Sequence, residues 1–199
     1  MTLFIAMCVF SLTMSISPGP VNMVIVSSGA NHGFRRTIPF VSGATIGFTL
    51  LLIVVSFWLM KFVSAYPVFL MYLELVGAAF IVYVGYRIAL APPEISVERQ
   101  RTPTFVEGFL LQWLNPKAWV ACASGAALFS SSYATLLAFI SVYFLVCYLS
   151  LAAWAVLGDR VAVLLHSRLR IRIFNLTMGV MLIATAAYLM YAQVTQQMT

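Results

Sequence analysis

The chain has 199 residues, of which 63% are hydrophobic and 8% are charged, and its mean hydropathy is +1.02. Soluble domains carry about a quarter of their residues as charged side chains, so this composition excludes an ordinary soluble domain and indicates an integral membrane protein. The net charge of +6 does not indicate a nucleic-acid partner, because the basic residues lie between apolar runs rather than in one patch. We expect a single domain surrounded by the lipid bilayer.

Six apolar segments are long enough to cross the hydrocarbon core, which takes about 20 residues of helix. The first starts close to the N-terminus with no basic residue before it, so we expect a retained span rather than a cleaved signal peptide. Residues 159–173 place apolar side chains at helical spacing among arginines, which predicts an interfacial helix. The predicted spans are 3–26, 38–60, 67–90, 105–125, 133–156 and 174–192.

Lysine and arginine are distributed unevenly among the connecting segments. The segments after the first, third and fifth spans hold or adjoin nine of the eleven basic residues. Because cytoplasmic loops carry the excess of such residues, we predict these three loops in the cytoplasm and both termini on the opposite side. The nine residues are Arg35, Arg36, Arg87, Arg99, Arg101, Arg160, Arg168, Arg170 and Arg172.

The stretch Ser17-Pro18-Gly19-Pro20 interrupts the first apolar run. Proline lacks an N–H group and its ring crowds the carbonyl four residues earlier, so the carbonyls of Met14 and Ile16 should lose their helical partners. A new helix can start at Val21, with its free N–H groups and positive dipole end facing the break. We therefore predict an opened helix rather than a simple bend.

A second stretch, Asn115-Pro116-Lys117, interrupts the fourth apolar run and should deprive the Gln112 carbonyl of its partner. Its proline lies 98 residues after Pro18, in a matching place of the other half. Three spans per half, an odd number, make the two halves cross the membrane in opposite directions. We predict an all-α fold of two inverted three-helix repeats, residues 1–91 and 105–199, whose first helices are broken by proline, joined by a cytoplasmic linker at 92–104.

The paired breaks point to a substrate site between them. Loose backbone is tolerated at membrane depth only where it is buried in protein or lines a cavity. Free carbonyls suit an ammonium group and a helix N-terminus suits a carboxylate, so the site fits a zwitterion. The alternative is that the prolines only shape the bundle. The candidate substrate-binding residues are Ser17, Pro18, Gly19, Pro20, Asn22, Asn115, Pro116 and Lys117.

Two charged residues lie well inside predicted spans. Placing the Lys117 charge in the membrane costs free energy unless the charge is paired or solvated, so Lys117 is a functional candidate. The alternative is that its long side chain reaches the membrane interface. Asn115 can cap the helix or hold a substrate ammonium. Glu74 is a candidate coupling residue that could pair with Lys117, or it lies near the outer headgroups. The three cysteines show no paired spacing and have no nearby histidine, so we expect neither a metal site nor a cofactor.

Motifs along essentially the whole chain resemble one protein family. They are Ser17-Pro18-Gly19-Pro20 with Asn22, Gly33 and Arg36; Gly77-Ala78-Ala79-Phe80 with Tyr83 and Gly85; and Gly108 with Asn115-Pro116-Lys117-Ala118. This pattern resembles the lysine exporter (LysE/RhtB) family of amino-acid efflux proteins. Members often have Asp or Asn directly after Pro-Gly-Pro, where this chain has Val21.

The resemblance implies a secondary transporter in the bacterial inner membrane, where the distribution of basic residues places both termini in the periplasm. It implies efflux of amino acids or close derivatives, driven by the proton gradient through alternating access. Two other functions stay open: efflux of another small solute or a cation on the same scaffold, and a non-transporting membrane scaffold subunit. An enzyme is not expected, because no span offers a nucleophile and base at a suitable spacing. Assembly into a homo-oligomer is also left open.

Overall fold

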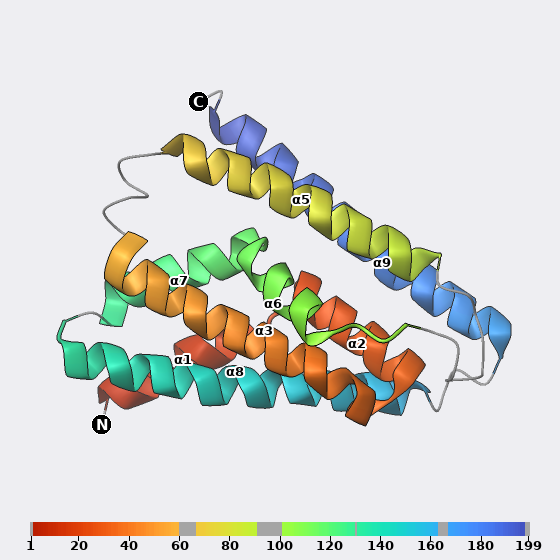
Figure 1. Ribbon diagram of the computed structural model, residues 1–199, viewed down its shortest axis with the longest axis horizontal. Coiled ribbons are helices and arrows are strands. Elements are labelled where there is room, and N and C mark those ends of the chain that lie inside the picture. The colour runs from red at the N-terminus through yellow and green to blue at the C-terminus, as the bar shows by residue number, and fades with distance from the viewer. Residues whose placement is uncertain (1, 60–66, 91–100, 130, 163–166, 198–199) are drawn as a thin grey trace.

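The computed structural model describes residues 2–59, 67–90, 101–129, 131–162 and 167–197 (Figure 1). Every regular element within these ranges is a helix, which confirms the predicted all-α class. The elements are α1 (Thr2–Ile16), α2 (Pro20–His32), α3 (Phe34–Val54), the π-helical η1 (Val55–Leu59), α5 (Pro67–Ala89), α6 (Phe105–Trp113), α7 (Pro116–Phe129), α8 (Tyr133–Ala162) and α9 (Arg168–Gln197).

Several described helices fit a bilayer by length and composition. The segments Phe34–Phe57 and Tyr133–Val161 each qualify as a span, and the bent pair of α1 and α2 makes a third if it is counted as one. Large apolar side chains cover the outside of the bundle; Leu149 is 68% exposed and Leu128 is 63% exposed. A surface of this kind is suited to lipid rather than to water. The protein is therefore a multi-pass membrane protein, while the count of six spans stays a prediction.

Both predicted helix breaks are present. The axes of α1 and α2 meet at 63° across residues 17–19, and α6 ends before α7 starts at Pro116. Pro20 and Pro116 each begin the second helix of their pair, where a missing N–H has no cost and the fixed φ favours the helix. The predicted start at Val21 was one residue late. The proline that corresponds to Pro116 is Pro20, 96 residues earlier, and not Pro18.

Several segment boundaries differ from the sequence prediction by a few residues. The second half of the first span continues as α2 to His32, six residues beyond the predicted end. The interfacial helix predicted at 159–173 was wrong for its described residues, because α8 runs to Ala162 and α9 starts at Arg168. Apolar spacing among arginines is shared by an interfacial helix and by the ends of two long helices, so the sequence pattern did not separate them.

Glycines allow two helix pairs to approach closely. A Cβ atom added to Gly43 of α3 would collide with the backbone of Phe105 at the start of α6. A Cβ atom added to Gly29 of α2 would lie 2.5 Å from the carbonyl oxygen of Ala155 in α8. Small residues at such positions let helix backbones touch, which is how membrane helices commonly associate. These contacts hold α2 and α6, which flank the two breaks, against the long helices α8 and α3.

In the third closely packed pair, α5 and α9, each helix contributes a glycine to the contact. A Cβ atom on Gly85 would lie 2.9 Å from the Gly179 carbonyl oxygen, and one on Gly179 would meet the Gly85 carbonyl oxygen. The two helices run side by side in opposite directions along one face of the molecule (Figure 1). The other helix contacts are related between the two halves in the same way: α3 packs on α8, α3 packs on α6 and α7, and α8 packs on α1 and α2. Each of these contacts therefore has a counterpart made by the equivalent helices of the other half.

The helix ends that carry the described arginines lie at one end of the molecule. Figure 1 shows the end of α2, the start of α3, the end of α5, the end of α8 and the start of α9 toward the right, and the segment that leads into α6 enters from the same side. The N- and C-termini both lie at the left. Arg99 and Lys61 lie outside the described residues. The described arginines thus gather at one end of the bundle, as the distribution of basic residues among the loops predicted.

Candidate functional site

The first break is closed by side chains that bond to its backbone carbonyls. Asn22, which is buried in the first turns of α2, donates from Nδ2 to the Ser15 carbonyl oxygen at 3.0 Å. The Ser17 hydroxyl donates to the Met14 carbonyl oxygen at 3.2 Å. The Ser17 carbonyl oxygen accepts a bond of 2.6 Å from the ammonium of Lys117. The carbonyls bound by distant side chains are those of Ser15 and Ser17, whereas the sequence pointed to Met14 and Ile16.

The second break is closed by Asn115, which is buried. Its side-chain Oδ1 accepts from the backbone N–H of Lys117 at 3.2 Å, and its backbone carbonyl accepts from the N–H of Ala118 at 2.9 Å. Asn115 therefore acts as the cap of α7, one of the two roles its sequence position allowed. The Gln112 carbonyl keeps a partner, because the N–H of Asn115 donates to it at 3.2 Å.

Lys117 joins the two breaks. Its side chain leaves the start of α7, passes Gly19 and ends on the Ser17 carbonyl. A Cβ atom built on Gly19 would lie 3.3 Å from both Cδ and Nζ of Lys117, so the glycine leaves room for this side chain. A bond of 2.6 Å from an ammonium is a short, charge-assisted hydrogen bond. The side chain therefore points into the bundle rather than along its stem to an interface.

Glu74 belongs to α5, but its side chain lies outside the described part of the structure. Its pairing with Lys117 and its role in coupling therefore stay predictions. The helix itself packs against α7, on which Lys117 lies.

A cavity of about 30 Å³ lies between the breaks. That volume admits about one water molecule and is far smaller than an amino acid. The Ser15 hydroxyl lines it and has no hydrogen-bond partner among the described residues. The lining residues are Met14, Ser15, Gly19, Val21, Asn22, Phe48, Gln112, Asn115, Lys117, Ala118, Ala121, Tyr143, Cys147 and Leu151. The cavity is therefore too small for an amino acid and must enlarge before a solute can enter.

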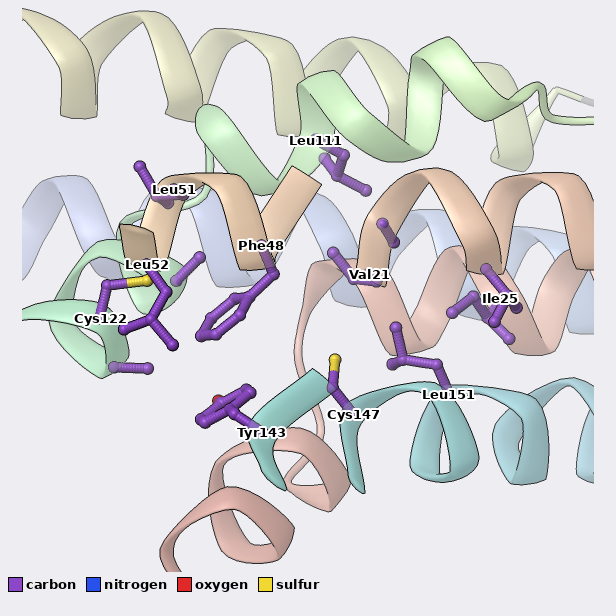
Figure 2. Packing of buried hydrophobic residues seen from close by; sticks show 14 of the residues in the cluster. Val21, Ile25, Phe48, Leu51, Leu52, Leu111, Cys122, Tyr143, Cys147 and Leu151 are labelled. Carbon is purple, nitrogen blue, oxygen red and sulfur yellow. The ribbon is translucent and has the colours of Figure 1, made fainter. Parts of the chain in front are cut away.

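Apolar side chains from several helices close the cavity on its other sides. Phe48 of α3 stacks on Tyr143 of α8, with ring centroids 4.3 Å apart and an interplanar angle of 12°. Figure 2 shows these two rings facing each other, with Cys147 pointing from α8 toward Val21 at the start of α2. None of the described lining residues is an aspartate or a glutamate. The cavity thus offers a cation, backbone carbonyls and amides beside a small apolar surface.

Sequence reasoning identified the polar side of this site and missed the apolar side. Seven of the eight candidates surround the breaks through bonds or helix starts, or line the cavity, and Pro18 lies between the two helices of its pair. Ser15 and Gln112 were missed, although each is a polar residue in an apolar run next to a proline break. Tyr143 and Cys147 were also missed, because the face that a buried helix turns toward a site leaves no mark in a uniformly apolar sequence.

A family model described as LysE type translocator matches residues 12–193. The chain belongs to this family. The match covers both breaks and both long helices, and it confirms the resemblance drawn from the proline motifs. The family is described as translocators, which agrees with the expected class of membrane transporter rather than with an enzyme.

Relatives of known function match part of the chain. A cysteine/O-acetylserine efflux protein of Escherichia coli (strain K12) is 28% identical over 116 residues, which are 58% of this chain and 60% of the relative. The protein of the same name from Shigella sonnei (strain Ss046) gives the same identity and the same coverage. The matched region thus spans about three fifths of these relatives. No solved structure gives a significant match.

Proposed function

We propose that this translocator exports small neutral amino acids or close derivatives from the bacterial cytoplasm. The single observation that carries the proposal is the 2.6 Å bond between the Lys117 ammonium and the Ser17 carbonyl. An ammonium group is already bound to the backbone that the first break sets free. The site therefore has the chemistry to hold a primary ammonium, at a place formed jointly by both broken helices.

A zwitterion can replace this internal bond with two bonds of the same kind. Its ammonium takes the carbonyl of Ser17, and its carboxylate takes the released ammonium of Lys117. Neither charge is left unpaired in the membrane, where an unpaired charge is costly. A solute with only the ammonium leaves Lys117 without a partner, and a solute with only the carboxylate leaves the Ser17 carbonyl without a donor. The exchange therefore selects for the α-amino-acid group as a whole.

The surroundings of the cavity favour a small and uncharged side chain. Ala118, Ala121 and Cys147 offer little volume and no charge, and the described lining holds no carboxylate to balance a cationic side chain. The named substrates of the relatives, cysteine and O-acetylserine, have side chains that are neutral and small. We therefore infer that lysine-like substrates are excluded, although the family name refers to that class.

Transport by alternating access between two inverted repeats is the mechanism that we infer. The interchange of helix pairs between the halves and the reciprocal contact of Gly85 with Gly179 support it. The arginine-bearing end lies in the cytoplasm and both termini lie in the periplasm, by the charge rule for inner-membrane proteins. Rocking of one repeat against the other would open the cavity to each side in turn. Proton coupling, with Glu74 as the candidate carrier, completes the proposal.

The test is efflux from proteoliposomes containing the purified chain. Labelled cysteine, O-acetylserine and lysine are loaded inside, and efflux is followed with a proton gradient and without one. We expect efflux of the first two and not of lysine. Two fragments of cysteine serve as controls: cysteamine lacks the carboxylate and 3-mercaptopropionate lacks the ammonium, and we expect neither to be transported. Efflux of either fragment at the rate of cysteine would contradict the exchange.

A further inference from the structure

A second and larger cavity lies at the arginine-bearing end, and we propose that it is the loading site where a substrate carboxylate binds before it reaches the breaks. This inference rests on the proposed function and its orientation. The cavity has a volume of about 410 Å³, within the range of pockets that hold small molecules. It lies between α2, α5, α6 and the segment that leads into α6.

Two arginines line this cavity, Arg101 and Arg87, and Arg87 is the one more weakly paired with Glu107. Its guanidinium lies 3.9 Å from the Glu107 carboxylate and 3.5 Å from the Tyr83 hydroxyl, both at the far limit for such contacts. The Glu107 carboxylate has closer partners than Arg87: Arg101 lies 3.3 Å from its Oε1, and its Oε2 accepts from the N–H of Thr104 at 2.8 Å. Arg87 is thus held loosely beside a carboxylate that is already engaged. A guanidinium in that state can bind a ligand carboxylate through two parallel N–H bonds.

His32 adds a second observation that points to a ligand. It lines the same cavity at the end of α2, and both of its ring nitrogens are buried without a hydrogen-bond partner among the described residues. The Ser28 backbone lies next to the ring but outside hydrogen-bond geometry. Buried polar groups without partners are rare in folded proteins, and a bound water, ion or solute is one explanation for them. A rotation of the ring offers one nitrogen to a carboxylate or an ammonium in the cavity.

The loading site and the break site are neighbours. Val24 and Leu111 line the large cavity, whereas Val21 and Gln112 line the small one. These residues are one turn apart on α2 and adjacent on α6, so only a thin layer separates the two spaces. Leu111, which is fully buried and lies between α6 and the centre of the bundle in Figure 2, belongs to this layer. The large cavity is then separated from the small cavity at Lys117 by about one turn of α2.

The experiment compares Arg87→Gln with the matched variant Arg168→Gln, an exposed arginine at the same end that does not line the cavity. Cysteine efflux is measured against internal concentration in proteoliposomes selected for a single orientation. We expect Arg87→Gln to raise KM about tenfold with the maximal rate unchanged, and Arg168→Gln to change neither. An unchanged KM in Arg87→Gln would overturn the loading site.

Inhibition of the wild-type chain gives a readout that does not depend on the variants folding. We expect 3-mercaptopropionate to compete with cysteine from the arginine-bearing side without being transported, because its carboxylate fits Arg87. Cysteamine, which has no carboxylate, should not compete at this site. Absence of inhibition by 3-mercaptopropionate would also overturn the proposal. Failure of the wild-type chain to export any amino acid would instead refute the proposed function.

Discussion

Lys117 and Ser17 are 100 residues apart in the sequence, and one bond of 2.6 Å between an ammonium and a backbone carbonyl connects them. The bond links the start of α7 to the break between α1 and α2. Each half of the chain therefore supplies one partner of the contact on which the proposed substrate exchange depends.

Gly19→Ala should weaken export without preventing folding. The new methyl group would lie 3.3 Å from Cδ and Nζ of Lys117, so the flexible lysine must move by a few tenths of an ångström away from the Ser17 carbonyl. The backbone at Gly19 is extended, with φ −168° and ψ 177°, a conformation that alanine adopts freely. We expect a several-fold lower rate of cysteine efflux at a normal amount of protein in the membrane.

Ser17→Ala is the matched control for this variant. It removes a hydroxyl that bonds only to the Met14 carbonyl and leaves the Ser17 backbone carbonyl in place. We expect an efflux rate within about twofold of the wild type. If Ser17→Ala lowers efflux more than Gly19→Ala does, the side chain rather than the carbonyl is the functional group.

The double substitution Pro18→Ala and Pro20→Ala should abolish export. Without the two prolines, α1 and α2 can join into one continuous helix, and the carbonyls of Ser15 and Ser17 regain helical partners. The 63° bend and the Lys117 acceptor would then be lost together. We expect the protein to insert normally and to export nothing. Export at the wild-type rate would show that the prolines are kinks without a role at the site.

The breaks and their cap could be predicted from sequence because proline acts locally. A missing N–H and a ring clash fix where a helix ends, whatever surrounds it. The position of Asn115 beside Pro116 likewise suggested its capping role. The α-helical class could be predicted because the apolar runs are long enough to cross the bilayer as helices.

The partner of Lys117 and the large cavity could not be predicted, because both depend on how the helices are rotated about their axes. In apolar runs such as that of α8, nearly every face is hydrophobic, so the pattern does not show that Tyr143 and Cys147 turn toward the site. The role of Glu107 was open to prediction: Thr104-Phe105-Val106-Glu107 is a capping-box pattern, and the structure shows both of its reciprocal bonds.

Gly108→Ala should destabilise the fold. Its Cβ atom would collide with the backbone carbonyl of Phe40, which has no flexible end that can move away. Overpacking of this kind costs about 1–3 kcal/mol. Thermal unfolding of the detergent-solubilised protein measures the effect, and we expect a lower Tm than for the wild type. The contrast is Gly19→Ala, where the neighbour is a flexible side chain; an equal loss in both variants would contradict the close packing of α3 on α6.

Reporter fusions test the orientation of the chain. We expect cytoplasmic reporters to be active after Arg36, Arg101 and Arg172, and periplasmic reporters to be active at Thr199. Both termini lie at the end of the molecule opposite the described arginines (Figure 1), so reporters in the arginine-bearing loops and a reporter at Thr199 should give opposite results. A cytoplasmic reporter that is active at Thr199 would refute the predicted orientation and the direction of loading from the arginine-bearing end.

The most direct test of the zwitterion exchange is cysteine efflux by Lys117→Met in proteoliposomes. Methionine has nearly the length of lysine but no ammonium, so it keeps the packing beside Gly19 and can neither bond to Ser17 nor receive a carboxylate. We predict a loss of at least tenfold in efflux rate at an unchanged Tm, together with loss of the preference for cysteine over cysteamine. Wild-type efflux with that preference intact would contradict the account.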